Sequence, residues 1–236
     1  IDDVKCGRSE SKSNWAGGNM GEVVQVRTVR KNVRRWKFER QAAEQGFARI
    51  AGVDEAGRGP LAGPISAGAV VLAYPIKGLN DSKLLTEDER ERLYAKITNG
   101  DHAVGCALVS HEEIDGRGIQ QANYGAMILA VEQLVPAPDY LLVDGFRIPG
   151  CVFPHLRIVK GDQLSQSIAA ASIIAKVTRD RLMLEYEALY PGYGFAKHKG
   201  YATAEHFAAI ETLGPCPIHR RSFSPFSVQL DTAPLF

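Results

Sequence analysis

Two adjacent carboxylates followed by a glycine-rich loop are the residues of this chain best suited to chemistry. Asp54 and Glu55 follow the short apolar run 50–53, and Gly57-Arg58-Gly59 comes almost directly after them. Two acids this close repel each other unless a cation lies between them, and hard divalent cations prefer carboxylate oxygens. The glycines let the backbone approach a ligand closely, so that amides and an arginine can meet an anion. This pattern indicates phosphodiester chemistry, and its alternative is a solvated turn followed by an ordinary loop.

Two further acids follow apolar runs later in the chain. Asp144 comes directly after the run YLLV at 140–143, and Asp162 follows the run 156–159 and Lys160-Gly161. Acids at strand ends meet at one edge of an open sheet, where ligands tend to bind. Asp162 also precedes a long predicted helix, so a helix cap is the structural alternative for it.

Basic and aromatic residues supply candidate phosphate contacts. Lys83 lies just ahead of a predicted helix N-terminus, a region that favours anions, although an exposed lysine also serves solubility. Lys197, Lys199 and Tyr201 lie together in a basic and aromatic segment. Cations beside an aromatic ring suit a phosphate backbone and a stacked sugar or base, and the alternative is an ordinary loop with a half-buried tyrosine.

Alternating apolar runs and helical spacings predict the elements that position these residues. Short apolar runs predict strands, of which the second would return antiparallel to the first. Thr86 and Glu89 form a capping box, Pro136 ends one helix and Thr203 can cap another. The predicted strands are 50–53, 65–73, 104–110, 140–143 and 156–159, and the predicted helices are 29–45, 86–97, 119–135, 165–190 and 203–213.

Composition and length describe an ordinary globular protein. The chain has 236 residues, 45% of them hydrophobic, and a net charge of +1, so any basic surface must be local. The four cysteines are scattered, which favours free thiols in a reducing compartment. No run is long enough to span a bilayer and no signal peptide opens the chain, so a cytoplasmic protein is expected. Residues 1 to about 30 read as a disordered leader, followed by a basic helix with Trp36 and Phe38 partly buried, which could add phosphate affinity or be a solvated lead-in.

The ordered set of motifs resembles the bacterial ribonuclease HII family, the type 2 ribonucleases H, over residues 49–226. The motifs are GVDEAGRGPLAGP at 52–64, NDSK at 80–83, LLVDG at 141–145, KGDQ at 160–163, AAASIIAKVTRDR at 169–181, HKGYAT at 198–203 and PIHRRSF at 217–223. The related ribonuclease HIII is expected to lack the Gly57-Arg58-Gly59 triplet and to carry an N-terminal platform domain. Neither feature fits this sequence.

The resemblance implies an α/β ribonuclease H-like fold, with a mixed central sheet flanked by helices and a helical C-terminal part. It also implies endonucleolytic cleavage of RNA in RNA·DNA hybrids and incision 5′ to ribonucleotides embedded in duplex DNA, leaving 3′-hydroxyl and 5′-phosphate ends. Two divalent ions, Mn²⁺ or Mg²⁺, would act on the scissile phosphate. The family's four catalytic and metal-binding acids match Asp54, Glu55, Asp144 and Asp162.

The resemblance assigns a junction sensor as well. The triplet Gly57, Arg58 and Gly59 would hold the ribonucleotide through its 2′-OH and adjacent phosphates, and Tyr201 would stack on the next deoxyribose. The supporting phosphate contacts would be Lys83, Lys197 and Lys199. The segment 116–123, GRGIQQAN, departs from the expected Asn-Ile-Leu-Gln-Ala-Thr, which leaves substrate contacts from that helix open.

The expected organisation is a leader at 1–46, a catalytic domain at 47–230 and a tail at 231–236. The protein is expected to be a monomer and not to bind a membrane. The six histidines are expected to be spectators or packing groups. Two rival functions remain: another nuclease of the same broad fold, such as a junction resolvase or an exonuclease, and a catalytically silent nucleic-acid-binding module. The acid set argues against the silent module, because four carboxylates without metal would repel nucleic acid.

Overall fold

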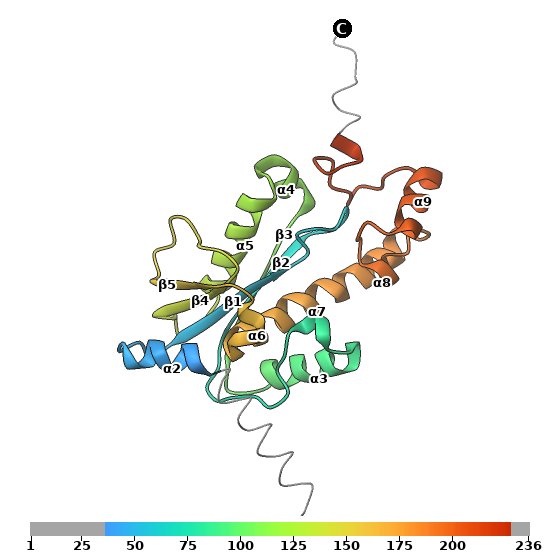
Figure 1. Cartoon of the computed structure of the whole chain (residues 1–236). Helices are drawn as coiled ribbons and strands as arrows, with labels where there is room; N and C mark the ends of the chain where they lie inside the picture. Colours follow the sequence, from blue (N-terminus) through green and yellow to red (C-terminus); the bar gives the residue numbers. More distant parts are fainter. Residues whose placement is uncertain (1–35, 228–236) are drawn as a thin grey trace, which may run out of the picture.

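The protein is built around a five-stranded sheet with strand order β3-β2-β1-β4-β5 (Figure 1). The structure is a computed structural model that describes residues 36–227, so predictions for the leader up to residue 35 and for the C-terminal tail lie outside the described residues. The strands are β1 Ile50–Ala56, β2 Ile65–Val71, β3 Ala103–Val109, β4 Tyr140–Asp144 and β5 His155–Ile158. All five strands predicted from the sequence are therefore present.

The sheet is mixed. β2 pairs antiparallel with β1 and β3, and β4 pairs parallel with β1 and β5. β1 runs on through Asp54 and Glu55 to Ala56, because Asp54 and Glu55 pair with Gly68 and Ala67 of β2. The strand is therefore longer than the predicted 50–53 and includes both acids. The two acids are ladder residues, and strand alternation sends their side chains to opposite faces.

Helices cover both faces of the sheet. The described helices are α2 Lys37–Glu44, the 3₁₀ turn η1 Ser82–Leu84, α3 Glu87–Thr98, α4 His111–Arg117, α5 Ile119–Glu132, α6 Gly161–Leu164, α7 Gln166–Leu189, α8 Phe195–His198 and α9 Ala204–Leu213. The predicted capping box opens α3, with Thr86 and Glu89 bonded in both directions. α4 and the short helices α6 and α8 were not predicted, and α8 occupies part of the segment expected to be a loop.

The α5 face carries the larger core. Ala51 and Val53 of β1 pack there with Leu141 and Val143 of β4 and with Met127 of α5. The opposite face meets α7. A Cβ added to Gly52 would lie 2.0 Å from the Ser167 carbonyl carbon, so only glycine lets β1 approach α7 this closely.

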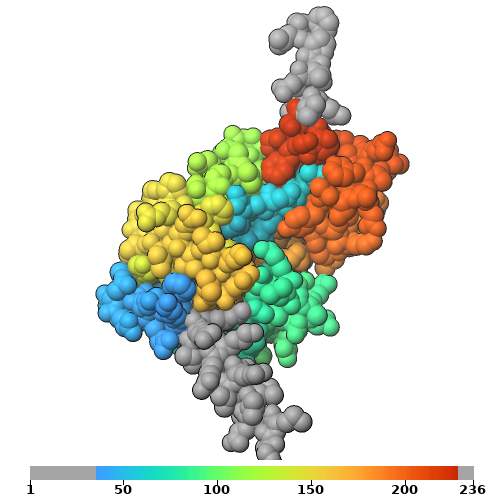
Figure 2. Space-filling model, in the orientation of Figure 1, coloured from blue at the N-terminus to red at the C-terminus, as the bar shows by residue number. Residues whose placement is uncertain are grey.

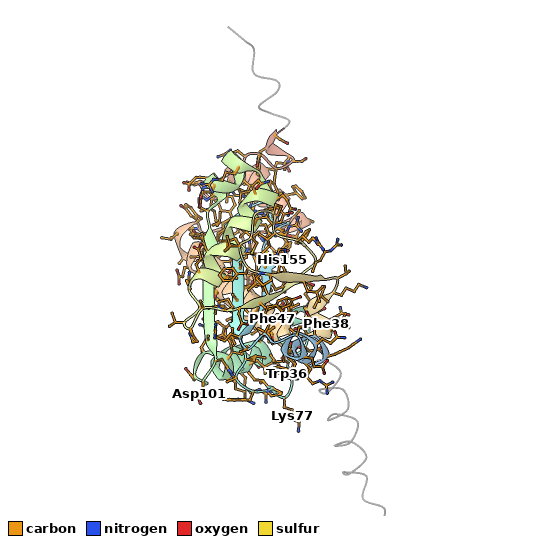
Figure 3. All side chains as sticks on the ribbon, turned by 90° about the vertical axis from the view of Figure 1, so that its left-hand side faces the viewer. Trp36, Phe38, Phe47, Lys77, Asp101 and His155 are labelled. Carbon is orange, nitrogen blue, oxygen red and sulfur yellow. The ribbon has the colours of Figure 1, made fainter. Side chains whose placement is uncertain are left out.

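The N-terminal end of α7 is fastened by α2. Ser165 is the N-cap of α7 and accepts from the Ile168 amide. The buried Glu39 of α2 accepts from the Ser165 hydroxyl at 2.6 Å and from the Ser167 amide and hydroxyl at 3.0 and 2.9 Å. Phe38 and Trp36 are partly buried, as predicted, and lie with Phe47 around α2 at the lower end of the sheet (Figure 3). The predicted basic helix is thus docked on the catalytic domain over the residues described.

The C-terminal part is helical, which confirms the expected fold. α8 and α9 pack beside the C-terminal half of α7 around Met183, Tyr193 and Phe195 (Figure 1). Thr203 caps α9 as predicted, by accepting from the His206 amide. Three cysteines, Cys106, Cys151 and Cys216, are free, and Cys6 lies outside the described residues. None of the described helices combines the length and apolarity that a membrane crossing requires.

Candidate active site

Asp54 and Glu55 face different helices from neighbouring positions of β1. Asp54 is 5% exposed and lies on the α7 side, where its Oδ1 accepts from the Glu55 amide at 2.8 Å. Burial, followed by the charges of Glu55 and Asp144, raises the pKa of Asp54 well above its usual value, while the Ser172 hydroxyl of α7 opposes that rise. A carboxylate in these surroundings is held against strong desolvation.

Glu55 lies on the α5 side. Burial raises its pKa to about 7 against the attraction of Arg58, and Asp144 adds to the rise while Asn123 and Lys83 oppose it. The Arg58 guanidinium is 3.8 Å from Glu55 Oε1, but the buried Oε2 has no hydrogen-bond partner among the described residues. Glu55 therefore keeps one oxygen free for a ligand.

Asp144 and Asp162 join this pair because β4 lies parallel and next to β1. Asp144 ends β4, and its Oδ1 accepts from the Gly161 amide at 2.5 Å, which ties the start of α6 to the strand end. Burial raises the pKa of Asp144, and burial followed by the charges of Asp81 and Asp144 raises that of Asp162 to about 6. Because Ser165 caps α7, the cap alternative for Asp162 was wrong.

Lys83 is the cation that the acids share. Burial alone would lower its pKa, but Asp81, Asp162, Asp54 and Asp144 together outweigh that effect and raise it. Asp81 was not singled out from the sequence. It is 6% exposed, accepts from the Lys83 amide at 3.0 Å and from Gln163 at 3.2 Å, and its only sequence signal was its place in NDSK.

The triplet and Tyr201 also come together. Gly59 is exposed, and a Cβ placed on it would lie 3.9 Å from Cε1 of the Tyr201 ring, which is 43% exposed. The Arg58 side chain turns inward instead. Its Nη2 donates to Gln120 Oε1 at 2.9 Å and its guanidinium lies 4.4 Å from the centre of the Phe146 ring. The backbone of the triplet, rather than its arginine side chain, therefore faces Tyr201.

Lys197 and Lys199 are engaged locally. Lys197 forms an ion pair with Glu205, and the Lys199 ammonium donates to the Ala196 carbonyl. Lys83 interacts electrostatically with all four acids, whereas neither of these two lysines is among the main influences on any of them. They flank Tyr201 in sequence and are not drawn into the acid cluster.

The departure at 116–123 lies directly behind Glu55 and Arg58. Gln120 holds Arg58, and the fully buried Asn123 faces Glu55. Gln120 Nε2 and both polar side-chain atoms of Asn123 lack hydrogen-bond partners among the described residues. Sequence reasoning flagged this segment as unusual but had no signal that its amides support the acids.

Three histidines form a buried chain behind Tyr201. His206 Nδ1 must donate to the Tyr201 carbonyl at 2.9 Å, so neutral His206 accepts at Nε2, where His219 Nε2 donates at 3.1 Å. With its proton on Nε2, His219 accepts at Nδ1 from the Cys216 thiol at 3.1 Å, and the Cys216 carbonyl lies 3.2 Å from the same nitrogen. His198 stacks on His206 with ring centres 4.4 Å apart. The prediction of packing groups holds for their burial, but His206 and His219 also form an ordered hydrogen-bond chain to Tyr201.

The acid set suits a divalent cation. Its donors are hard carboxylate oxygens, burial and mutual repulsion raise their pKa values, and Glu55 Oε2 is buried without a partner. Within residues 36–227 no three such side chains converge on a preassembled cation position. A cation would therefore draw the acids together and relieve their repulsion.

Segments that are distant in the chain meet on one face of the molecule. In Figure 2 the cyan segment that includes β1 and the loop after it lies between the yellow to gold segment of β4 to α6 and the orange C-terminal part. The four acids come from the first two of these segments and Tyr201 comes from the third. The segments that carry the predicted acids and the predicted sensor residues thus meet on one face of the molecule (Figure 2).

The chain is similar to known proteins in both sequence and fold. A family model described as ribonuclease HII matches residues 51–225. Similar curated proteins include ribonuclease HII of Geobacter sulfurreducens, 55% identical over 80% of this chain and 88% of that protein, and ribonuclease HII of Geobacillus kaustophilus, 54% identical over 80% and 73%. The crystal structure of ribonuclease H2 from Pyrococcus horikoshii superposes with a TM-score of 0.64 at 28% identity, over 77% of this chain and 96% of that one.

Proposed function

The chain belongs to the ribonuclease HII family and is a ribonuclease H, and from that premise we propose that it cleaves the RNA strand of RNA·DNA hybrids and incises 5′ to single ribonucleotides in duplex DNA. The observation that carries the proposal is the meeting of the acids of β1, β4 and α6 with the Gly59 backbone and the exposed Tyr201. The acids supply the chemistry and the backbone with Tyr201 supplies the selection of substrate.

Asp54, Glu55, Asp144 and Asp162 would hold two divalent ions, Mn²⁺ or Mg²⁺. When bound, such ions activate the attacking water and stabilise charge on the departing 3′ oxygen, so the products are a 3′-hydroxyl and a 5′-phosphate. Lys83 balances the negative charge of the acids and contacts a substrate phosphate. No side-chain nucleophile is required.

Recognition would depend on the 2′-OH, which is what distinguishes RNA from DNA. The amides of the triplet would bind the ribonucleotide and its phosphates, and Tyr201 would stack on the following deoxyribose. Replacing Tyr201 by Ala should reduce cleavage of single-ribonucleotide duplexes more than it weakens nonspecific duplex binding. Tyr74→Ala is the matched control, because Tyr74 is similarly exposed at 48% and lies against another ring, His102, with ring centres 4.5 Å apart. Equal losses of cleavage and binding in Tyr201→Ala would contradict the sensor role.

The decisive experiment incubates the purified protein with a duplex that contains one ribonucleotide, in Mn²⁺ and in Mg²⁺ in turn. Cleavage 5′ to the ribonucleotide with no cleavage of the all-DNA duplex is expected. Cleavage of the all-DNA duplex would favour another nuclease of the same fold, and metal-independent binding without cleavage would favour a silent binding module.

The acid assignment is tested by Asp54→Asn, which should abolish cleavage while the protein stays folded. Asp101→Asn is the control, because Asp101 is an exposed aspartate between α3 and β3 (Figure 3). Near-normal turnover by folded Asp54→Asn would refute the metal-binding role.

A further inference from the structure

Two fully buried arginines hold the loop that follows β1. Arg220, 0% exposed, donates to the carbonyls of Gly57 at 2.6 Å, Arg58 at 3.0 Å, Gly63 at 2.9 Å and Pro64 at 3.2 Å. Arg179, 1% exposed, donates to Pro64 at 2.9 Å, Ala62 at 3.0 Å and Lys199 at 2.9 Å. Arg179 is therefore buried between α7 and this loop, despite its charge.

Neither guanidinium has a carboxylate within ion-pairing distance among the described residues. Burying such a charge is costly, and burial lowers the pKa of Arg220 to about 9. A planar five-donor group repays part of this cost only where several acceptors surround it. The carbonyls that surround Arg220 include two from the triplet, in addition to two from the end of the loop.

The hydrogen bonds from Arg220 to two carbonyls of the triplet also determine where the amides of the same peptide units point. In a trans peptide the N–H points away from the C=O of the same unit, and the cis peptides found in residues 36–227 lie elsewhere. The Gly57 carbonyl shares its unit with the Arg58 amide, and the Arg58 carbonyl shares its unit with the Gly59 amide. By drawing both carbonyls into the core, Arg220 aims both amides outward.

The outward amides are available to a ligand. Neither the Arg58 nor the Gly59 amide donates a hydrogen bond to any residue that the structure describes. Gly59 is exposed, and its Cα side faces the Tyr201 ring. Two unpaired N–H groups beside an exposed aromatic ring form a preorganised site, at which the amides can donate hydrogen bonds to an anion or to a hydroxyl oxygen.

We propose that Arg220 is the positioning residue of the junction sensor, because it fixes the peptides 57–58 and 58–59 so that the Arg58 and Gly59 amides are held ready for the 2′-OH and adjacent phosphate. This inference rests on the proposed function. Arg179 has the complementary task, since it links the end of the same loop to the Lys199 carbonyl, two residues before Tyr201. The hydrogen bonds of the Arg220 guanidinium all go to backbone carbonyls, and its other neighbour is the Phe223 ring, with 5.1 Å from the guanidinium carbon to the ring centre, so Arg220 takes no part in the chemistry.

The test compares Arg220→Lys with wild type on a single-ribonucleotide duplex. Lysine keeps the charge but cannot serve four separated carbonyls, so the amides lose their fixed direction. We expect KM to rise by about ten-fold with kcat within about two-fold, the size of losing one to two hydrogen bonds. An all-DNA duplex used as inhibitor should lose less affinity, because its binding needs no 2′-OH contact.

If Arg220 only stabilised the fold, its replacement would change kcat and the free energy of unfolding rather than KM. Ile97→Ala, a change in the buried core at α3, is the control for stability, because it leaves a cavity far from the loop that Arg220 holds. Partial unfolding lowers the active fraction and hence kcat, and leaves KM unchanged. An Arg220→Lys protein with unchanged KM, or with equal losses on both duplexes, overturns the inference. If wild type itself does not cut the ribonucleotide duplex, the proposed function fails instead.

A second measurement needs no variant. In ¹⁵N-labelled wild type with a chelator present, the amide signals of Arg58 and Gly59 should shift more on adding the single-ribonucleotide duplex than on adding the all-DNA duplex. Identical shifts with both duplexes overturn the inference even if Arg220→Lys fails to fold.

Discussion

The histidine chain behind Tyr201 predicts that acid weakens the fold through His219. His219 is fully buried between the Cys216 thiol and His206, and burial lowers its pKa from 6.5 to about 4. The perturbation is His219→Gln, because the glutamine amide can still donate to His206 Nε2 but does not titrate.

The direction of the change in stability with pH depends on whether the folded or the unfolded chain binds the proton at His219 more tightly. Below pH 6.5 the unfolded chain takes up a proton at His219 that the folded protein refuses until about pH 4. This part of the stability is therefore complete above pH 6.5 and is lost as the pH falls toward 4. Linkage gives about 2.5 kcal/mol between pH 7.5 and 4.5, and about 2 kcal/mol after a discount for partial solvent screening.

The assay is urea unfolding followed by circular dichroism, in chelator, for both proteins at pH 7.5 and 4.5. At pH 7.5 the variant should be less stable by about 1–2 kcal/mol, because it loses the thiol hydrogen bond and ring packing against Phe195. At pH 4.5 this difference should shrink to near zero. Glu55 and Asp162, whose pKa values burial raises to about 7 and about 6, titrate in the same range, but they contribute equally to both proteins and cancel in the difference.

His155→Gln is the control, because His155 lies in β5, outside the chain of histidines. Its difference from wild type should not follow the same course with pH. If the wild type and His219→Gln lose stability in parallel from pH 7.5 to 4.5, His219 is not held neutral in the folded state and the reasoning is refuted.

Three other outcomes can be checked. Glu39→Ala should lower the free energy of unfolding by about 2–4 kcal/mol in urea, because three donors at Ser165 and Ser167 lose their acceptor, and an unchanged value would show that α2 does not fasten α7. Gln120→Leu should raise KM on a ribonucleotide duplex by about five-fold by releasing Arg58, measured at constant salt; an unchanged KM would mean that Glu55 and Phe146 suffice to hold it. Saturating Mn²⁺ at pH 8 should raise the Tm of wild type by several degrees in a thermal scan. The rise should be much smaller in Asp54→Asn, which lacks one of the acids proposed to bind the ion.

Local pattern was enough to predict the acids but not their supports. Asp144 follows an apolar run that can only be a buried strand, and strand ends gather at one sheet edge. Arg220 acts on carbonyls 156 to 163 positions away, and Glu39 on donors 126 and 128 positions away. Spacing carries no information at such separations. The burial of Arg179 could not be predicted from a polarity pattern either, because such a pattern treats an arginine as exposed and contains no information on the backbone acceptors that make its burial tolerable.

The register of β1 explains why the site contains two adjacent acids with different surroundings. Since β1 continues straight through the pair, Asp54 takes the face of Gly52 and meets Ser172 of α7, while Glu55 takes the face of Val53 and meets Asn123 of α5. Asp144, from the neighbouring parallel strand, raises the pKa of both. A shift of one residue in the pairing of β1 would exchange these surroundings and turn Val53 toward α7, where even a Cβ on Gly52 would lie 2.0 Å from the Ser167 carbonyl carbon. The glycine at 52, which admits α7, and the valine at 53, which fills the α5 core, therefore fix the register that sets the two acids in place.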